Sequence, residues 1–222
     1  MVQERYLRHV LHWGEKNQQQ LANCSVLVAG LGGLGAIVSQ LLARAGVGTL
    51  YLVDDGKIDP PDLNRQLLYS EADLGQPKLA VAAARLRQIN STITLTPLPG
   101  RITPGFTIPD DVHVVADCLD NYASRFALET CLSPGTFLVH GGIEGDQGQV
   151  LTLQKSRSRP FAEIFSGCLQ PPGPIAVTGA GATVLAGLMA NELYSVIFGE
   201  PKLLDRCLVV GLEDLHLSFL EV

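Results

Sequence analysis

Three glycines between an apolar run and a helical pattern are the most informative chemical feature of the chain. The segment Val26–Gly35 reads VLVAGLGGLG, in which Gly30, Gly32 and Gly35 have the spacing G-x-G-x-x-G. In this motif the first glycine permits a tight turn, the second lets the backbone approach a phosphate, and the third lets helix and strand pack closely. The N-terminus of the following helix offers free N–H groups to an anion. The motif therefore predicts a nucleotide-binding turn, with Gly33 as an additional glycine.

Charged side chains follow the strands that this turn is expected to join. Asp54 comes about 20 residues after the glycines, where a carboxylate can accept hydrogen bonds from a ribose. Arg65 and Lys78 come next, and Asp120 follows the apolar run at 112–116. Since the carboxyl ends of parallel strands share one sheet edge, we expect Arg65, Lys78 and Asp120 to meet above the glycine loop. Two cations and a carboxylate beside a nucleotide suit phosphate chemistry, in which the cations hold phosphates and the carboxylate holds Mg²⁺.

Each of these side chains also has a structural explanation. Arg65 can be a solvated loop charge, Lys78 a first-turn helix residue, and Asp120 the N-cap of a helix expected at 122–132. A cation is not favoured in the first turn of a helix, so Lys78 is mildly anomalous there. A nicotinamide or flavin oxidoreductase would explain the glycines but would leave Arg65 and Lys78 without a role. Phosphate chemistry is therefore the favoured interpretation, and the oxidoreductase is the alternative.

The composition is that of an ordinary folded domain. The 222 residues carry a net charge of −6, and 46% are hydrophobic and 17% charged, which argues against disorder and against a nucleic-acid partner. The N-terminus MVQERYLRHV has charges where a signal peptide needs an apolar core. The apolar stretch Ile175–Ala190 is too short to span a bilayer comfortably and predicts a buried helix. We therefore expect one soluble, cytoplasmic domain over residues 1–222, without a membrane partner.

The order of elements predicts an α/β, Rossmann-like three-layer fold with a mixed sheet. Strands alternate with helices in the N-terminal half, which is typical of a parallel sheet, and antiparallel strands are added in the C-terminal half. Residues 155–174 are rich in Pro, Ser and Arg and predict a long, mobile crossover loop. The expected helices are 5–13, a second short one from the break at Gly14 to about 22, 33–45, 77–89, 122–132 and 177–198. The expected strands are 25–29, 49–53, 92–98, 112–116, 136–139, 149–153, 207–211 and 215–222.

The ordered motifs GLGGLG, LVD, LNRQ, GQPK and LDN resemble the ThiF/MoeB/HesA family, the bacterial relatives of ubiquitin-activating enzymes. The segment RYLRHV resembles the N-terminal helix of that family, and the match runs from about Arg5 to Gln149. The resemblance implies ATP-dependent adenylation of the C-terminal glycine carboxylate of a small ubiquitin-like sulfur carrier, with release of pyrophosphate. Sulfur transfer for thiamin or molybdenum/tungsten cofactor biosynthesis is the implied setting. ATP and Mg²⁺ are the implied ligands, and a carrier ending in Gly-Gly and a second copy of the chain, forming a homodimer, are the implied partners.

The resemblance also implies a role for individual residues. Asp54 would bind the ribose, Asp120 would hold Mg²⁺, and Arg8 would reach across the homodimer as an arginine finger. The implied catalytic residues are Arg8, Arg65, Lys78 and Asp120. The implied nucleotide-binding residues are Gly30, Gly32, Gly33, Gly35, Asp54, Asn64, Gln66 and Asn121.

Three features depart from the pattern of the family. Asp62 stands where the family has Asn before Leu-x-Arg-Gln, which adds a negative charge near the phosphates. The structural zinc of the family uses two C-x-x-C pairs, whereas only Cys168 stands here, so we expect no zinc. The crossover-loop cysteine of some members is missing from PPGPIAV, which leaves Cys168 with either a covalent or a merely structural role. These departures keep a non-catalytic ATP-binding scaffold open as a second alternative.

Overall fold

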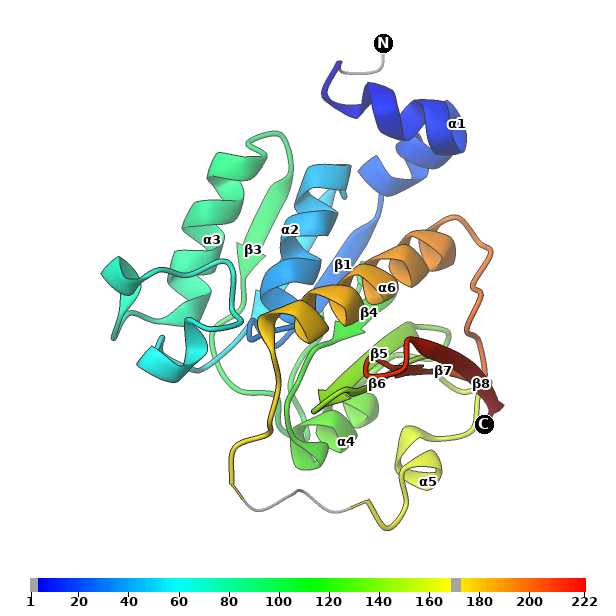
Figure 1. The fold of residues 1–222 in the computed structure, drawn as a ribbon. Coiled ribbons are helices and arrows are strands. Elements are labelled where there is room, and N and C mark those ends of the chain that lie inside the picture. Colours follow the sequence, from blue (N-terminus) through cyan, green and yellow to red (C-terminus); the bar gives the residue numbers. More distant parts are fainter. Residues whose placement is uncertain (1–3, 169–172) are drawn as a thin grey trace.

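One eight-stranded mixed sheet organises the chain (Figure 1). The computed structural model describes residues 4–168 and 173–222. The strand order is β3-β2-β1-β4-β5-β6-β7-β8; neighbours from β3 to β5 pair in parallel, and those from β5 to β8 pair antiparallel. The strands are β1 (Ser25–Ala29), β2 (Thr49–Val53), β3 (Thr94–Pro97), β4 (Val114–Asp117), β5 (Phe137–Glu144), β6 (Gln147–Gln154), β7 (Arg206–Gly211) and β8 (His216–Glu221).

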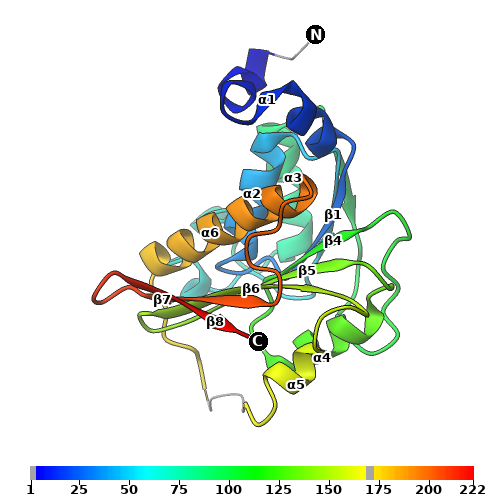
Figure 2. The ribbon, with the colours of Figure 1, turned by 90° about the vertical axis from the view of Figure 1, so that its right-hand side faces the viewer.

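Helices cover both faces of this sheet (Figures 1 and 2). One face carries α2, α3 and α6, and the other carries α4 and α5, while α1 lies beyond the amino end of β1. The three-layer α/β architecture with a parallel N-terminal half is thereby confirmed. The helices are α1 (Leu7–Ala22), α2 (Gly35–Ala45), α3 (Lys78–Ile89), α4 (Tyr122–Cys131), α5 (Phe161–Ile164) and α6 (Gly179–Ile197), with short 3-10 turns η1 (Glu4–Tyr6), η2 (Pro60–Asp62) and η3 (Glu71–Asp73).

The central strand β1 is buried on both faces because two separate cores meet at it. Val26 and Val28 belong to the core under α2, α3 and α6, whereas Leu27 and Ala29 belong to the core under α4 and α5. Successive side chains of a strand point to opposite faces, so a strand between two helical layers must be apolar throughout. The run SVLVA has this composition, which places β1 in the middle of the sheet and the glycine turn at its carboxyl end.

Besides shifts of one or two residues at several element ends, two segments differ from the sequence prediction. The predicted break at Gly14 is confirmed, with φ +83° and ψ 164° inside α1. The strands predicted at 136–139 and 149–153 are longer and form one hairpin, because strand pairing continues through residues 140–144 and 147–148. The predicted loop 155–174 is not irregular throughout, since it contains α5, which is anchored by the fully buried Phe161. Residues 169–172 of that loop lie outside the described residues.

Helix α6 is long and apolar enough, by length and composition, to cross a membrane. In the structure about half of it is buried, and it packs against β5, β6 and α2. Its apolar side chains therefore have a place in the protein core, as predicted for the stretch Ile175–Ala190.

Glu192 joins α6 to the sheet through buried hydrogen bonds. Its carboxylate, 2% exposed, accepts the Thr152 hydroxyl at 2.9 Å and the backbone N–H groups of Lys202 at 3.0 Å and Leu203 at 2.9 Å.

Glu192→Ala leaves these donors without an acceptor. We therefore expect urea unfolding to show that the free energy of unfolding falls by about 2–4 kcal/mol. Glu200→Ala removes only an exposed ion pair with Lys202 and should change stability by less than about 0.5 kcal/mol. Equal effects of the two substitutions would contradict this role of Glu192.

Candidate nucleotide-binding site

A cleft of about 830 Å³ lies at the carboxyl ends of β1, β2 and β4. Open α/β sheets bind ligands at this edge, and ligand sites have volumes of about 300–1,000 Å³. The walls come from the glycine loop, the loops after β2 and β4, the start of α3 and the segment 173–177. Ten of the predicted site residues line this cleft: Gly30, Gly32, Gly33, Asp54, Asn64, Arg65, Gln66, Lys78, Asp120 and Asn121.

Two glycines of the loop are required by the backbone around them. Gly30 has φ +88°, and a Cβ at this position would lie 2.8 Å from the carbonyl oxygen of Cys118. A Cβ on Gly35, the first residue of α2, would lie 1.8 Å from the carbonyl oxygen of Gly30. Gly35 is therefore not a cleft residue but the point at which α2 packs against the turn. Its predicted role as the glycine of close helix–strand packing agrees with this geometry.

Asp54 connects the end of β2 to the glycine loop. Its Oδ2 accepts the backbone N–H of Leu31 at 2.7 Å, and its Oδ1 accepts that of Gly56 at 2.8 Å. Each oxygen of an ionised carboxylate can accept more than one hydrogen bond. Asp54 is therefore both a structural support of the turn and compatible with accepting a ribose hydroxyl.

Lys78 and Arg65 stand on the same wall of the cleft, on either side of Asp62. The Lys78 ammonium lies 3.0 Å from Asp62 Oδ2, and the Arg65 guanidinium lies 3.7 Å from Asp62 Oδ1. Arg65 also donates to the carbonyl of Pro61 at 2.8 Å and to the exposed side chain of Asn64 at 3.1 Å. The ion pair with Asp62 accounts for a cation at the start of α3, since a carboxylate offsets the unfavourable helix dipole.

Asp120 and Asn121 have separate roles at the start of α4. The Asn121 Oδ1 accepts the backbone N–H of Ser124 at 2.8 Å, so Asn121 is the N-cap and the alternative prediction of Asp120 as the cap is wrong. The Asn121 amide also donates to Asp120 Oδ1 at 3.1 Å. Asp120 is exposed on the cleft wall.

The donor set of the cleft suits a magnesium ion that is held together with phosphates. Within residues 4–168 and 173–222, no group of three or more His, Cys, Asp or Glu side chains could hold a metal ion by itself. Mg²⁺ is usually bound through one or two carboxylates, waters and substrate phosphates rather than by an all-protein cage. Asp120 offers one such carboxylate. The expectation that the protein holds no zinc stays a prediction.

A buried network that the sequence analysis missed holds the loop that carries Asp120. Arg125, on α4, donates to the carbonyl of Leu119 from Nε at 3.1 Å and from Nη2 at 2.6 Å. Asp117 accepts the Leu119 N–H at 3.1 Å and contacts His140 Nδ1 at 2.8 Å. The residue before Asp120 is thus held through both its N–H and its carbonyl. The signal that could have revealed this network is an arginine directly before the apolar residues FAL.

Arg8 and Cys168 are not among the described residues that line the cleft. Arg8 is exposed on α1, which precedes β1 and therefore lies at the opposite edge of the sheet (Figure 1). Cys168 is exposed and lies beside Tyr122, whose pKa is raised by burial and, in addition, by the Cys168 thiol. Within one protomer, the structure therefore does not bring these two side chains to the glycine loop.

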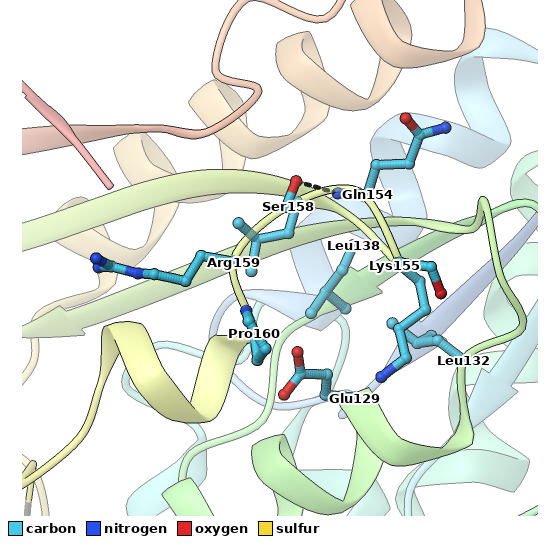
Figure 3. A pocket seen from close by; sticks show the side chains of 10 residues that line it. Glu129, Leu132, Leu138, Gln154, Lys155, Ser158, Arg159 and Pro160 are labelled. Carbon is cyan, nitrogen blue, oxygen red and sulfur yellow. Dashed lines mark hydrogen bonds between the residues drawn. The ribbon is translucent and has the colours of Figure 1, made fainter.

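A smaller cavity of about 180 Å³ lies between the end of α4, Leu138 of β5 and the segment 153–160 that precedes α5 (Figure 3). Its Glu129 carboxylate accepts the backbone N–H groups of Phe161 at 2.6 Å and Ala162 at 3.3 Å, at the start of α5. The Ser158 hydroxyl accepts the backbone N–H of Gln154 at 2.8 Å. These polar groups serve local structure, so the chemistry is assigned to the larger cleft.

Comparison with known proteins decides the family. The sequence matches the ThiF family over residues 6–221. The chain belongs to the ThiF family. It is 33% identical over 217 residues to the SAMP-activating enzyme E1 of Haloferax volcanii, a match that covers 91% of this chain and 78% of that protein. It is 35% identical over 209 residues to the sulfur carrier protein ThiS adenylyltransferase of Escherichia coli, covering 88% of this chain and 81% of that protein.

Other members of the family are longer. The pig adenylyltransferase and sulfurtransferase MOCS3 is 36% identical over 209 residues, and the match covers 88% of this chain but only 45% of that protein. The fold also occurs at lower identity. A crystal structure of E. coli MccB with ATP has a TM-score of 0.85 at 21% identity and covers 99% of this chain and 72% of that one.

His140 gives the network behind Asp120 a dependence on pH. Burial lowers the pKa of His140, Arg125 lowers it further, and Asp117 partly opposes both. The unfolded chain takes up this proton near the ordinary pKa of 6.5, whereas the folded chain takes it up only at a lower pH, so stability falls as the pH drops below 6.5. We expect His140→Gln to lose this part of the dependence, at most about 1.4 kcal/mol per pH unit, in urea unfolding between about pH 5 and 7.5.

The exposed His216 supplies the matched control. His216→Gln should keep the slope of stability against pH that the wild-type protein shows, because this side chain is accessible to water in both states. A folded His140→Gln protein with an unchanged slope would show that His140 is not the titrating group.

Proposed function

We propose that this protein adenylates the C-terminal glycine carboxylate of a small ubiquitin-like sulfur carrier, with ATP as the adenylyl donor and pyrophosphate as the leaving group. Relatives that are 33% and 35% identical and are named as a SAMP-activating enzyme and a ThiS adenylyltransferase support this proposal. The observation that carries it is that Arg65, Lys78 and Asp120 line one cleft with the glycine loop. Sulfur transfer for thiamin or molybdenum/tungsten cofactor biosynthesis is the proposed setting.

The proposed reaction joins two anions, so positive charge is what it needs most. A carboxylate oxygen of the carrier attacks the α-phosphorus of ATP, the bond from that phosphorus to the bridging oxygen breaks, and pyrophosphate leaves. No general base is required, because the glycine carboxylate is already ionised at neutral pH. Arg65 and Lys78 would reduce the repulsion, and one such group can lower the barrier by about 3–4 kcal/mol.

The other cleft residues have binding roles in this proposal. Asp54 would bind the ribose, and the backbone at Gly32 and Gly33 would approach the phosphates. Asn64 and Gln66 would help to bind the nucleotide beside Arg65. Mg²⁺, when bound through Asp120, would supply positive charge to the phosphate oxygens.

Carrier-dependent ATP–pyrophosphate exchange tests this function. We expect Arg65→Ala and Lys78→Ala each to lower the exchange rate roughly a hundredfold, because each removes a charge that offsets the repulsion between the reactants. The probe is a ubiquitin-like carrier ending in Gly-Gly. Lys202→Ala is the matched control. Within the described residues, the exposed Lys202 side chain forms an ion pair with Glu200 alone. We therefore expect this substitution to leave the exchange rate unchanged.

The two alternatives make different predictions in thermal-stability and exchange measurements. A nicotinamide oxidoreductase would be stabilised against heat by NADH and not by ATP with Mg²⁺. A non-catalytic scaffold would be stabilised by ATP and would show no exchange with any carrier. Either result would contradict the proposed adenylation.

A homodimer is the second part of the proposal, with Arg8 acting on the cleft of the partner. Helix α1, which carries Arg8, lies at the edge of the sheet opposite the cleft, and Arg8 does not line the cleft, which supports a role in another copy. Leu7 and Leu11, 54% and 79% exposed on the same helix, are apolar side chains that a two-fold interface would cover.

The five free cysteines support a reducing compartment, and we propose that this compartment is the cytoplasm.

Mixing two inactive variants tests whether Arg8 acts in the other protomer. A heterodimer of Arg8→Ala and Asp120→Ala chains contains one complete site, because the intact Arg8 of one chain faces the intact Asp120 of the other. With random assortment, we expect about a quarter of the wild-type sites to regain exchange activity. If heterodimers form and no activity returns, Arg8 does not act in trans.

A further inference from the structure

The carboxylate of Asp62 is the anion around which the cationic wall of the cleft is arranged. Its Oδ2 lies 3.0 Å from the Lys78 ammonium and accepts the backbone N–H of Asp59 at 3.1 Å. Its Oδ1 accepts the side-chain amide of Gln66 at 2.7 Å and lies 3.7 Å from the Arg65 guanidinium. Asp62 is only 9% exposed, so salt and water screen these interactions less than they screen a surface ion pair.

The same carboxylate determines how Gln66 is oriented. An ionised carboxylate only accepts hydrogen bonds, so Gln66 must turn its amide nitrogen toward Asp62. Its buried Oε1 then has no hydrogen-bond partner among the described residues. The amide nitrogen also lies next to the glycine loop, since a Cβ on Gly32 would be 3.6 Å from Gln66 Nε2. Lys78 and Gln66 are therefore held in place before a nucleotide arrives.

We infer that Asp62 is a positioning residue that also sets the affinity for ATP, because it holds Lys78 in the nucleotide-free cleft and competes with the triphosphate for it. The identity of the nucleotide rests on the proposed function. A triphosphate that enters the cleft needs the positive charge of Lys78 and meets the negative charge of Asp62 at the same place. Binding is weaker than it would be beside an uncharged side chain, while Lys78 keeps a defined position for the reaction.

The substitution Asp62→Asn separates the two effects. Asn keeps the size of the side chain and an oxygen that can accept the Asp59 N–H, but it removes the charge. We expect isothermal titration calorimetry to show that ATP with Mg²⁺ binds about five- to tenfold more tightly. We expect the kcat of carrier-dependent exchange to fall about tenfold, because no ion pair then holds Lys78. A residue that only supports folding would not produce tighter binding together with slower turnover.

Asp59→Asn is the matched control. It removes one negative charge next to the same turn, η2, where the Asp59 side chain accepts a backbone N–H and where Asn can act as the same cap. We expect its ATP affinity and kcat to stay within about twofold of wild type. If urea unfolding shows that Asp62→Asn is not folded, Asp62→Ser, whose hydroxyl can also accept the Asp59 N–H, takes its place.

Two outcomes would overturn the inference and leave the proposed function intact. If Asp62→Asn and Asp59→Asn raise the ATP affinity equally, the net negative charge near the cleft, and not the contact with Lys78, sets the affinity. Unchanged or weaker ATP binding in a folded Asp62→Asn protein would show that no competition exists. A wild-type protein that does not bind ATP in the calorimeter would overturn the inference and the proposed function together.

Discussion

The structure depends on one close approach of backbone to backbone, at the turn between β1 and α2. A Cβ on Gly35 would lie 1.8 Å from the carbonyl oxygen of Gly30, and a Cβ on Gly30 would lie 2.8 Å from that of Cys118. Any side chain at Gly35 would push α2 away from the sheet and open the core that α2 shares with α3 and α6. The same contact brings the start of α2 to the bottom of the cleft, so core packing and anion binding share one constraint.

The two walls of the cleft are held by different kinds of interaction. On one wall, Asp62 neutralises cations at the start of α3 and in the preceding loop, where the groups remain partly accessible to a ligand. On the other wall, Arg125 and Asp117 hold Leu119 through partly buried hydrogen bonds. The antiparallel half of the sheet supports this second wall, since β6 brings Gln149 to within 3.2 Å of His140. The cations that can meet a phosphate are thus held by an ion pair that a ligand can replace. The loop that carries Asp120 is instead held by hydrogen bonds within the protein.

Much of this arrangement could be predicted because it depends on local pattern. The spacing of glycines between an apolar run and a helical pattern is sufficient to place a turn at the edge of the sheet. The alternation of strands and helices makes the first half parallel, and parallel strands carry Asp54 and Asp120 to one edge. The break at Gly14 also follows from one residue. The hairpin β5–β6 was underestimated because Gly141 and Gly142 resemble a strand end in sequence, although pairing to β6 continues across them.

The amino-acid sequence by itself determined the fold class, the glycine turn and the set of charged residues at the carboxyl edge of the sheet, because each follows from spacing along the chain. Only the tertiary structure decided that Asn121 and not Asp120 caps α4, and that Asp62 pairs with Lys78. Two neighbouring residues can compete for one backbone N–H, and a carboxylate can pair with any cation within reach. The outcome depends on side-chain distances of a few ångströms, which packing sets and sequence spacing does not.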